Sequence, residues 1–220
     1  SLRLTRDLAG NLERVVINDG DEFDALRQAQ RDGRLPPQTH IEYAGEQKTL
    51  LFDAFNLETP IDKALKKRVW LPCGGYLIFD FAEALTVIDV NSGKMVTGKS
   101  VEETALRVNL EAVKELARQL RLRDVGGIVI VDLIDMEKDK NRQAVLAALK
   151  DAVKSDRMPV KIEGITRLGL LEMTRKRTRE SVEHVLCNEC PTCHGRGTVK
   201  TVETVCYEIM REIVRVHHAY

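Results

Sequence analysis

The sequence lacks any apolar run long enough to cross a membrane. It also lacks the basic start and apolar centre that mark a signal peptide. We therefore expect a cytoplasmic protein without a transmembrane segment.

The sequence also lacks net charge, because 34 Lys and Arg residues balance 34 Asp and Glu residues. A nucleic-acid enzyme of this composition would need a local basic patch or a separate binding domain.

Cysteine is scarce and odd in number. Three of the five residues fall within a stretch of seven, and the five are Cys73, Cys187, Cys190, Cys193 and Cys206. Such spacing is not that of a secreted disulfide framework, so it favours a cytoplasmic protein with a metal-binding cluster.

The first part of the chain, residues 1–68, reads as a small α/β piece. Residues 12–17 and 39–43 are strand-like, and residues 21–31 between them are helix-like. This part contains no recognisable motif of catalytic or metal-binding residues, and its sequence begins abruptly at Ser1. We expect it to be a fragment that depends partly on sequence outside this chain.

From residue 70 the pattern changes to longer elements. Residues 74–80 and 84–89 predict a hairpin, and Ser100 with Glu103 forms a capping box at the start of an amphipathic helix. A strand ending at Asp132, a second amphipathic helix and a strand at 160–163 follow. After a turn-rich segment at 187–197, a last helix carries an apolar stripe without a partner in this chain.

Two acids end the most strand-like runs of the chain. Asp89 and Asp132 each follow a β-branched apolar run, and a helical segment separates the two runs. A strand–helix–strand unit places the carboxyl ends of its strands at one edge of a sheet. Two carboxylates at one edge repel each other unless a cation lies between them, and Mg²⁺ with Asn91 as a neutral oxygen donor fits.

Other roles for these acids remain open at this point. Asp89 with the following Asn-Ser-Gly is also good turn chemistry. A calcium loop fits less well, because Ser100 stands where the bidentate Glu should be. Asp135 could be a third acid, but capping of the following helix is the simpler prediction.

Basic residues near the acids could hold a polyanion. The candidates are Arg123, preferred for its closeness in sequence to the Asp132 strand, and Arg121, Lys94 and Arg167. Arginine suits the role because its rigid fork of donors matches phosphate. The alternative is that these charges only line solvated faces.

The tail contains a cysteine pair with metal-ligand spacing. Cys190 and Cys193 are separated by two residues, so both sulfurs can reach one Zn²⁺ ion. A structural zinc site needs four ligands. Either Cys187 with His184 or His194 completes it within the chain, or a second copy supplies another pair. A redox dithiol fits less well, because the pair does not start a helix after a strand.

Taken together, these motifs resemble the RNase E/G family of bacterial endoribonucleases. The segments that carry the resemblance, in the family's order, are residues 83–93, 102–105, 117–127, 132–136, 167–175 and 190–193.

The resemblance implies an α/β architecture in four parts. These are a partial RNase H-like segment (1–68), a DNase I-like mixed-sheet catalytic subdomain (69–183), a small zinc link (184–200) and the first helix of a dimerisation domain (201–220). It also implies catalytic Mg²⁺ on Asp89 and Asp132, supported by Asn91. Cys190 and Cys193 would form half of a Zn²⁺ site shared in a homodimer or higher oligomer.

The resemblance further implies an activity. Family members cleave single-stranded, AU-rich RNA to 5′-phosphate and 3′-hydroxyl ends, in ribosomal RNA maturation and messenger RNA decay. The family's OB-fold and 5′-end sensor are not found in this sequence, which would explain the neutral charge. The alternatives are a non-catalytic RNA-binding or scaffold protein that keeps the fold and zinc link, and a DnaJ-like zinc module.

Overall fold

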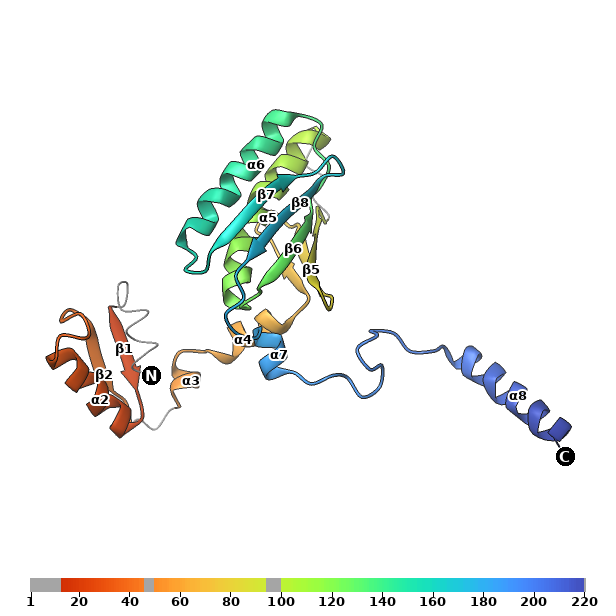
Figure 1. Ribbon diagram of the computed structural model, residues 1–220, viewed down its shortest axis with the longest axis horizontal. Coiled ribbons are helices and arrows are strands. Elements are labelled where there is room, and N and C mark those ends of the chain that lie inside the picture. Colours follow the sequence, from red (N-terminus) through yellow and green to blue (C-terminus); the bar gives the residue numbers. More distant parts are fainter. Residues whose placement is uncertain (1–12, 46–49, 94–99, 220) are drawn as a thin grey trace. The chain divides into compact units, whose positions relative to one another are not determined.

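The computed structural model describes residues 13–45, 50–93 and 100–219 (Figure 1). The chain divides into two compact units, Ser1–Lys66 and Lys67–Tyr220, and each is described here by itself. Among the described residues, no helix is both long and apolar enough to cross a lipid bilayer.

The first unit pairs two parallel strands beside a helix, as the sequence predicts. Its elements are β1 (Arg14–Ile17), α2 (Gly20–Arg31), β2 (His40–Tyr43), α3 (Leu51–Ala54) and α4 (Glu58–Leu65). The Asp19 carboxylate accepts a hydrogen bond from the Glu22 N–H at 2.9 Å and so caps α2. Leu26 and Ile41 pack between the helix and the strands as the core of this unit. Leu12, expected to start the first strand, lies outside the described residues.

The second unit is built on one six-stranded mixed sheet. The strands, in spatial order, are β3 (Arg68–Trp70), β4 (Tyr76–Phe81), β5 (Leu85–Asn91), β6 (Gly127–Asp132), β8 (Leu170–Arg175) and β7 (Val160–Ile165). Strands β5 and β6 are parallel, and each other neighbouring pair is antiparallel. The predicted hairpin of β4 and β5 is therefore confirmed, as is the strand–helix–strand unit that follows.

Helices α5 (Val101–Leu122) and α6 (Asp139–Ala152) cover one face of this sheet, which explains the burial pattern of the strands (Figure 1). In β5 the side chains of Thr86, Ile88 and Val90 are buried, whereas those between them are exposed or half-buried. Side chains alternate across a strand, so the second set lies on the face without helices. We call this second surface the open face of the sheet.

The remaining elements are short or exposed. A 3₁₀ turn (Val153–Ser155) follows α6, and helices α7 (Val182–Leu186) and α8 (Val202–Ala219) come after the sheet. Residues 187–201 between α7 and α8 form turns rather than helix or strand, as expected. The described side chains of the predicted stripe on α8 are exposed, among them Ile209 and Ile213.

Candidate active site

The two predicted acids lie side by side. In the parallel β5–β6 pair, Asp89 and Asp132 are register partners, so both side chains project from the open face of the sheet. Neighbouring strands are roughly 4.8 Å apart, which brings the two carboxylates close together. Asp89 is half-buried and Asp132 is exposed. The parallel strands thus place the acids as the sequence pattern predicts.

Asn91 supports Asp89 directly. Its Nδ2 donates a hydrogen bond to the Asp89 Oδ2 over 2.6 Å, and both side chains lie on the open face. Asp89 is therefore a residue of strand β5 whose carboxylate accepts a hydrogen bond from a side-chain amide of the same strand. This hydrogen bond orients the carboxylate through Oδ2 and does not use its second oxygen.

A close backbone contact fixes the end of β5. Gly93 has φ +62°, and a Cβ atom there would collide with the carbonyl oxygen of Gly74. A Cβ atom on Gly75 would lie only 2.7 Å from the Asn91 carbonyl oxygen. These glycines allow the β3–β4 turn to pack against the end of β5, which holds Asp89 and Asn91 in place.

The loop after Asp132 is held by helix α5. The buried Asn109 side chain donates to the Ile134 carbonyl at 2.8 Å and accepts from the Ile134 N–H at 3.1 Å. Glu102 accepts hydrogen bonds from the N–H groups of Glu137 and Lys138. Side chains from α5 therefore set the path of residues 133–138.

Glu102, and not Asp135, holds the backbone just before α6. The N-cap residue Lys138 offers no side-chain cap, and Glu102 accepts hydrogen bonds from the N–H groups of Glu137 and Lys138, just before the first turn of the helix. The hydrogen bond from the Glu137 N–H is the main cause that holds the pKa of Glu102 below its usual value; the Lys138 N–H adds to it, and burial opposes both. The sequence prediction that Asp135 caps this helix is wrong, because the helix begins at Asp139 with Lys138 as its N-cap residue.

Asn109→Ala is expected to destabilise this loop. The change leaves both backbone groups of Ile134 without their partner, at a cost of about 1–3 kcal/mol in the free energy of unfolding. Urea denaturation measures the effect, with Lys114→Ala on the exposed side of α5 as the control. Equal midpoints for the two variants would show that Asn109 does not hold the loop.

The predicted basic residues separate into two groups along the sheet. Arg167 lies in the turn between β7 and β8, and Leu170 at the start of β8 is the register partner of Asp132. The Arg167 turn therefore lies at the edge of the sheet that carries Asp89 and Asp132, which we call the acid edge, and the Arg167 side chain is exposed. Arg121 and Arg123 end α5, which runs back to the opposite edge, where β6 begins.

Arg123 occupies an interior position that does not suit a phosphate contact. Its side chain is only 2% exposed, it donates to the Gln119 Oε1 at 2.7 Å, and its guanidinium lies 4.4 Å from the Phe79 ring centroid. Burial lowers the pKa of this guanidinium, although Glu183 and Glu115 oppose the shift. Arg123 is close in sequence to β6, but it precedes that strand. It therefore lies at the opposite end of β6 from Asp132.

The other two basic candidates are not brought to the acids. Arg121 is exposed and donates to the Ser155 hydroxyl, at the far edge of the sheet. Lys94 lies outside the described residues. Among the four predicted basic residues, Arg167 is the one that the described structure places at the acid edge.

The acid pair fits a hard divalent cation. No Lys, Arg or His side chain among the described residues forms an ion pair with Asp89 or Asp132. Two adjacent carboxylates without a cationic partner, beside a neutral amide oxygen, form the donor set that Mg²⁺ prefers. Within the described part of the chain, no cluster of three or more His, Cys, Asp or Glu side chains could hold a metal. Solvent or substrate oxygens would have to complete such a site.

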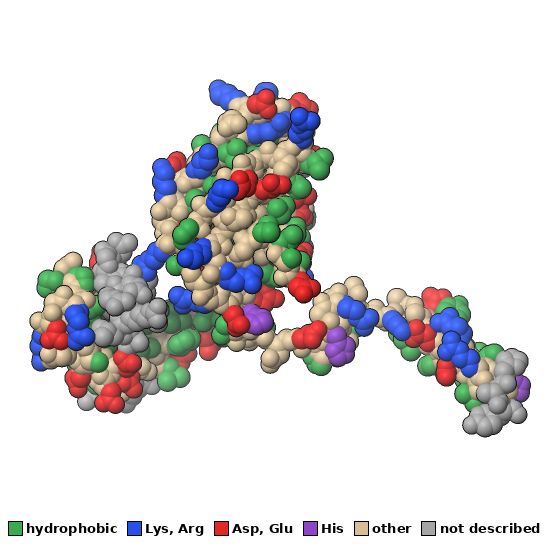
Figure 2. All heavy atoms as spheres, viewed as in Figure 1, with side chains coloured by type: hydrophobic (Ala, Val, Ile, Leu, Met, Phe, Trp, Pro, Cys, Tyr) green, Lys and Arg blue, Asp and Glu red, His purple; other side chains and the backbone are tan. Residues whose placement is uncertain are grey.

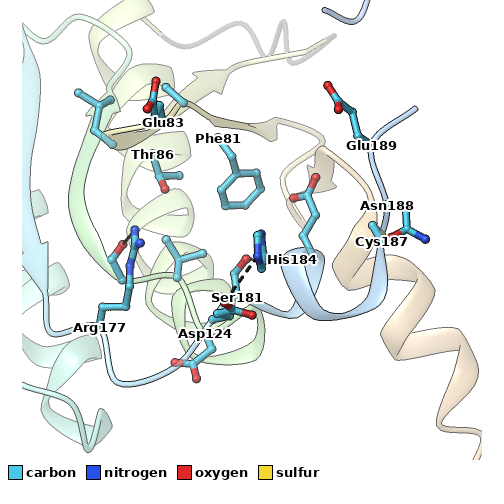
Figure 3. A pocket seen from close by; sticks show the side chains of 16 residues that line it. Phe81, Glu83, Thr86, Asp124, Arg177, Ser181, His184, Cys187, Asn188 and Glu189 are labelled. Atoms are coloured by element: carbon cyan, nitrogen blue, oxygen red, sulfur yellow. Dashed lines mark hydrogen bonds and ion pairs between the residues drawn. The ribbon is translucent and has the colours of Figure 1, made fainter. Parts of the chain in front are cut away.

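A separate hollow of about 540 Å³ lies at the opposite edge of the sheet. Figure 3 shows Phe81 and Thr86 facing Arg177 and His184 across it. It also contains several carboxylates, and its lining includes none of the predicted catalytic residues. The hollow is therefore distinct from the acid pair.

The cysteine pair forms a compact turn. The backbone N–H groups of Cys193 and Thr192 and the Cys193 thiol are directed at the Cys190 sulfur, and these hydrogen bonds hold the pKa of Cys190 below its usual range. Cys187 is exposed, and no third ligand joins the pair among the described residues. Two sulfurs are half of the ligands that a tetrahedral zinc site would need.

Comparison with known proteins now places the chain in a family. A model of the Ribonuclease E/G family matches residues 1–178. The chain belongs to this family.

Curated relatives extend the match to most of the chain. It is 51% identical to Ribonuclease G of Escherichia coli strain K12 over 220 residues, which cover 99% of this chain and 45% of that protein. It is 51% identical to Ribonuclease G of Haemophilus influenzae over 221 residues, covering 99% and 44%. It is 44% identical to Ribonuclease E of E. coli K12 over 171 residues, covering 78% and 16%. The chain thus spans less than half the length of each of these relatives.

Proposed function

We propose that this chain is the catalytic core of an endoribonuclease whose active centre is the Asp89–Asp132 pair. The observation that supports it best is the register of β5 and β6, which sets two carboxylates side by side on the open face without a cationic partner among the described residues. The Ribonuclease G and Ribonuclease E names of its relatives support the same activity.

Each residue of the site has a distinct role in this proposal. Asp89 and Asp132 would hold one Mg²⁺ ion, which when bound polarises a phosphoryl oxygen and lowers the pKa of a bound water. Asn91 orients the Asp89 carboxylate through its 2.6 Å hydrogen bond. Asn109 and Glu102 position the loop after Asp132, and Arg167 supplies a guanidinium for the RNA backbone at the same edge.

The substrate and its setting follow from the family. We propose single-stranded, AU-rich RNA, cleavage to 5′-phosphate and 3′-hydroxyl ends, and a role in ribosomal RNA maturation and messenger RNA decay in the cytoplasm. The RNase H-like and DNase I-like assignments of residues 1–68 and 69–183 are part of the same proposal. Figure 2 shows basic and acidic side chains interspersed on the face of the protein in view. RNA affinity would therefore depend on a few specific residues rather than on a broad basic surface.

A cleavage assay with metal control tests this function. We expect the protein to cut a fluorogenic single-stranded RNA in the presence of Mg²⁺, to stop when EDTA is added, and to recover when excess Mg²⁺ is restored. RNA binding without cleavage under every metal condition would instead support a non-catalytic RNA-binding protein that keeps the fold.

We also propose that Cys190 and Cys193 bind half of a Zn²⁺ site whose other two ligands come from a second copy of the chain. The hydrogen bonds that lower the pKa of Cys190 favour its thiolate, which is the form that binds zinc. The exposed apolar stripe of α8, which follows directly in sequence, is consistent with a homodimer.

Metal analysis of the purified protein is expected to give about half an equivalent of zinc per chain, because one tetrahedral site takes four sulfurs. Cys193→Ser should remove the zinc and shift the mass in solution toward the monomer, whereas Cys73→Ser, at a cysteine between β3 and β4, should change neither. A full equivalent of zinc in a monomer would contradict the shared site and would point to Cys187 or a histidine as further ligands.

A further inference from the structure

A cluster of aromatic and basic side chains lies on the open face beside the acid pair. Trp70 and Tyr76 are register partners on β3 and β4, and their ring centroids are 5.1 Å apart with the planes inclined at 63°. The Arg68 guanidinium lies 4.5 Å from the Tyr76 ring centroid and 5.7 Å from that of Trp70. We call Arg68, Trp70 and Tyr76 the aromatic cluster.

The aromatic cluster is exposed where burial would be expected. Trp70 is 63% exposed, although a tryptophan on a sheet ordinarily buries much of its large ring. Arg68 forms no ion pair with a carboxylate among the described residues, so its charge is directed at the rings and at solvent. An accessible π surface joined to an unneutralised cation is the chemistry that binds a nucleobase and its phosphate.

Sheet register connects this cluster to the acid pair. Tyr76 is the register partner of Asn91, which bonds Asp89, and Ile78 is the partner of Asp89 itself. Trp70 therefore lies two strands from Asn91, a lateral distance of roughly 10 Å at the usual strand spacing. The strand ends follow one another along a single edge in the order aromatic cluster, acid pair and Arg167 turn.

We propose that the aromatic cluster is a stacking site for a base of the RNA substrate, next to the phosphodiester that the acid pair would cleave. The proposal rests on the function proposed above and assigns an RNA contact to residues outside the sequence-predicted set. Trp70 offers its ring to a base, and Arg68 holds the adjoining phosphate. Because every base has a π face, the site would favour single-stranded over double-stranded RNA without strict sequence choice.

Trp70 reports on its own occupancy, because it is the one tryptophan of the 220-residue chain. In EDTA, which prevents cleavage, a short oligouridylate should quench its fluorescence saturably. An abasic ribose-phosphate oligomer of the same length should leave the emission nearly unchanged, because it has no base to stack. Equal quenching by both oligomers, or none by either, would overturn the proposal.

Cleavage kinetics provide the second readout. Trp70→Ala should lower kcat/KM for single-stranded RNA by about 5- to 150-fold, whereas Trp70→Phe should restore most of it. Phe52→Ala, at an exposed aromatic residue of the first unit, is the matched control and should have little effect. A Trp70→Ala enzyme as active as this control would overturn the stacking site.

The two proposals can fail separately. Quenching by oligouridylate without cleavage in Mg²⁺ would uphold the stacking site and contradict the nuclease. Cleavage in Mg²⁺ without quenching would uphold the nuclease and contradict the stacking site, leaving the exposed rings to a protein contact.

Discussion

Asp132→Asn is expected to lower kcat for RNA cleavage by at least about a thousandfold, with little change in fold. The substitution keeps the size of an exposed side chain but removes one of two adjacent charges that would bind Mg²⁺. A thousandfold loss corresponds to about 4 kcal/mol of transition-state stabilisation, within the several kcal/mol ascribed to a catalytic metal. Asp89→Asn should have the same effect, because both carboxylates would bind one ion.

Asp80→Asn is the matched control for this prediction. Asp80 is an exposed acid on the same sheet face, but it is paired with Lys67 at 2.7 Å and lies on β4, away from the acid pair. We expect its cleavage rate to stay close to that of the unmodified protein. If Asp132→Asn and Asp80→Asn cleave equally well, the proposed active centre is wrong.

Arg175→Met is expected to cost about 3–5 kcal/mol in the free energy of unfolding. Arg175 is a buried residue whose guanidinium bonds the Asp156 carboxylate at 2.8 Å, the Asp124 carboxylate at 2.9 Å and the Val125 carbonyl at 2.9 Å. Its removal leaves the Asp156 side chain, which is 4% exposed, as a buried charge without a partner. Calorimetry or urea denaturation measures the loss.

This loss should depend on pH in a defined direction. Burial raises the pKa of Asp156, but the hydrogen bonds from Arg175 and from the Met158 N–H outweigh it and hold the pKa below its usual value. The pair therefore stabilises the protein above the unfolded-state pKa of about 3.9, and this stability is lost as the pH falls through the lower folded-state pKa. The variant should thus approach the unmodified protein in strongly acidic solution.

An exposed ion pair supplies the control for Arg175. Lys154 bonds Asp151 at 2.6 Å at the end of α6, with the two side chains 74% and 71% exposed, so Lys154→Met should cost no more than about 1 kcal/mol. A similar loss of stability in the two variants would show that the buried network contributes no more than a surface pair.

Much of the acid site could be predicted because it depends on local sequence and one topological rule. The β-branched runs before Asp89 and Asp132 predict buried strands, and the intervening helix makes those strands parallel neighbours. The side chains that hold the site could not be predicted in this way. Asn109 and Glu102 act across 25 to 36 residues of sequence, and helical spacing does not indicate which loop they reach.

For the basic residues, closeness to Asp132 in the sequence does not indicate closeness to Asp132 in the structure. Arg123 is nine residues from Asp132 in the chain, yet the strand between them separates them along the sheet. Arg167 is much farther in sequence and lies at the acid edge, because β8 pairs antiparallel with β6. The aromatic cluster was missed for a related reason, since only the β3–β4 pairing brings Trp70 onto the face of Asp89.

Anomalous diffraction from crystals soaked in Mn²⁺ tests most directly whether Asp89 and Asp132 bind one divalent cation. We expect one peak between β5 and β6, about 2 Å from an oxygen of Asp89 and from an oxygen of Asp132. A map without a peak there, with both carboxylates held in salt bridges to Lys or Arg, would contradict it.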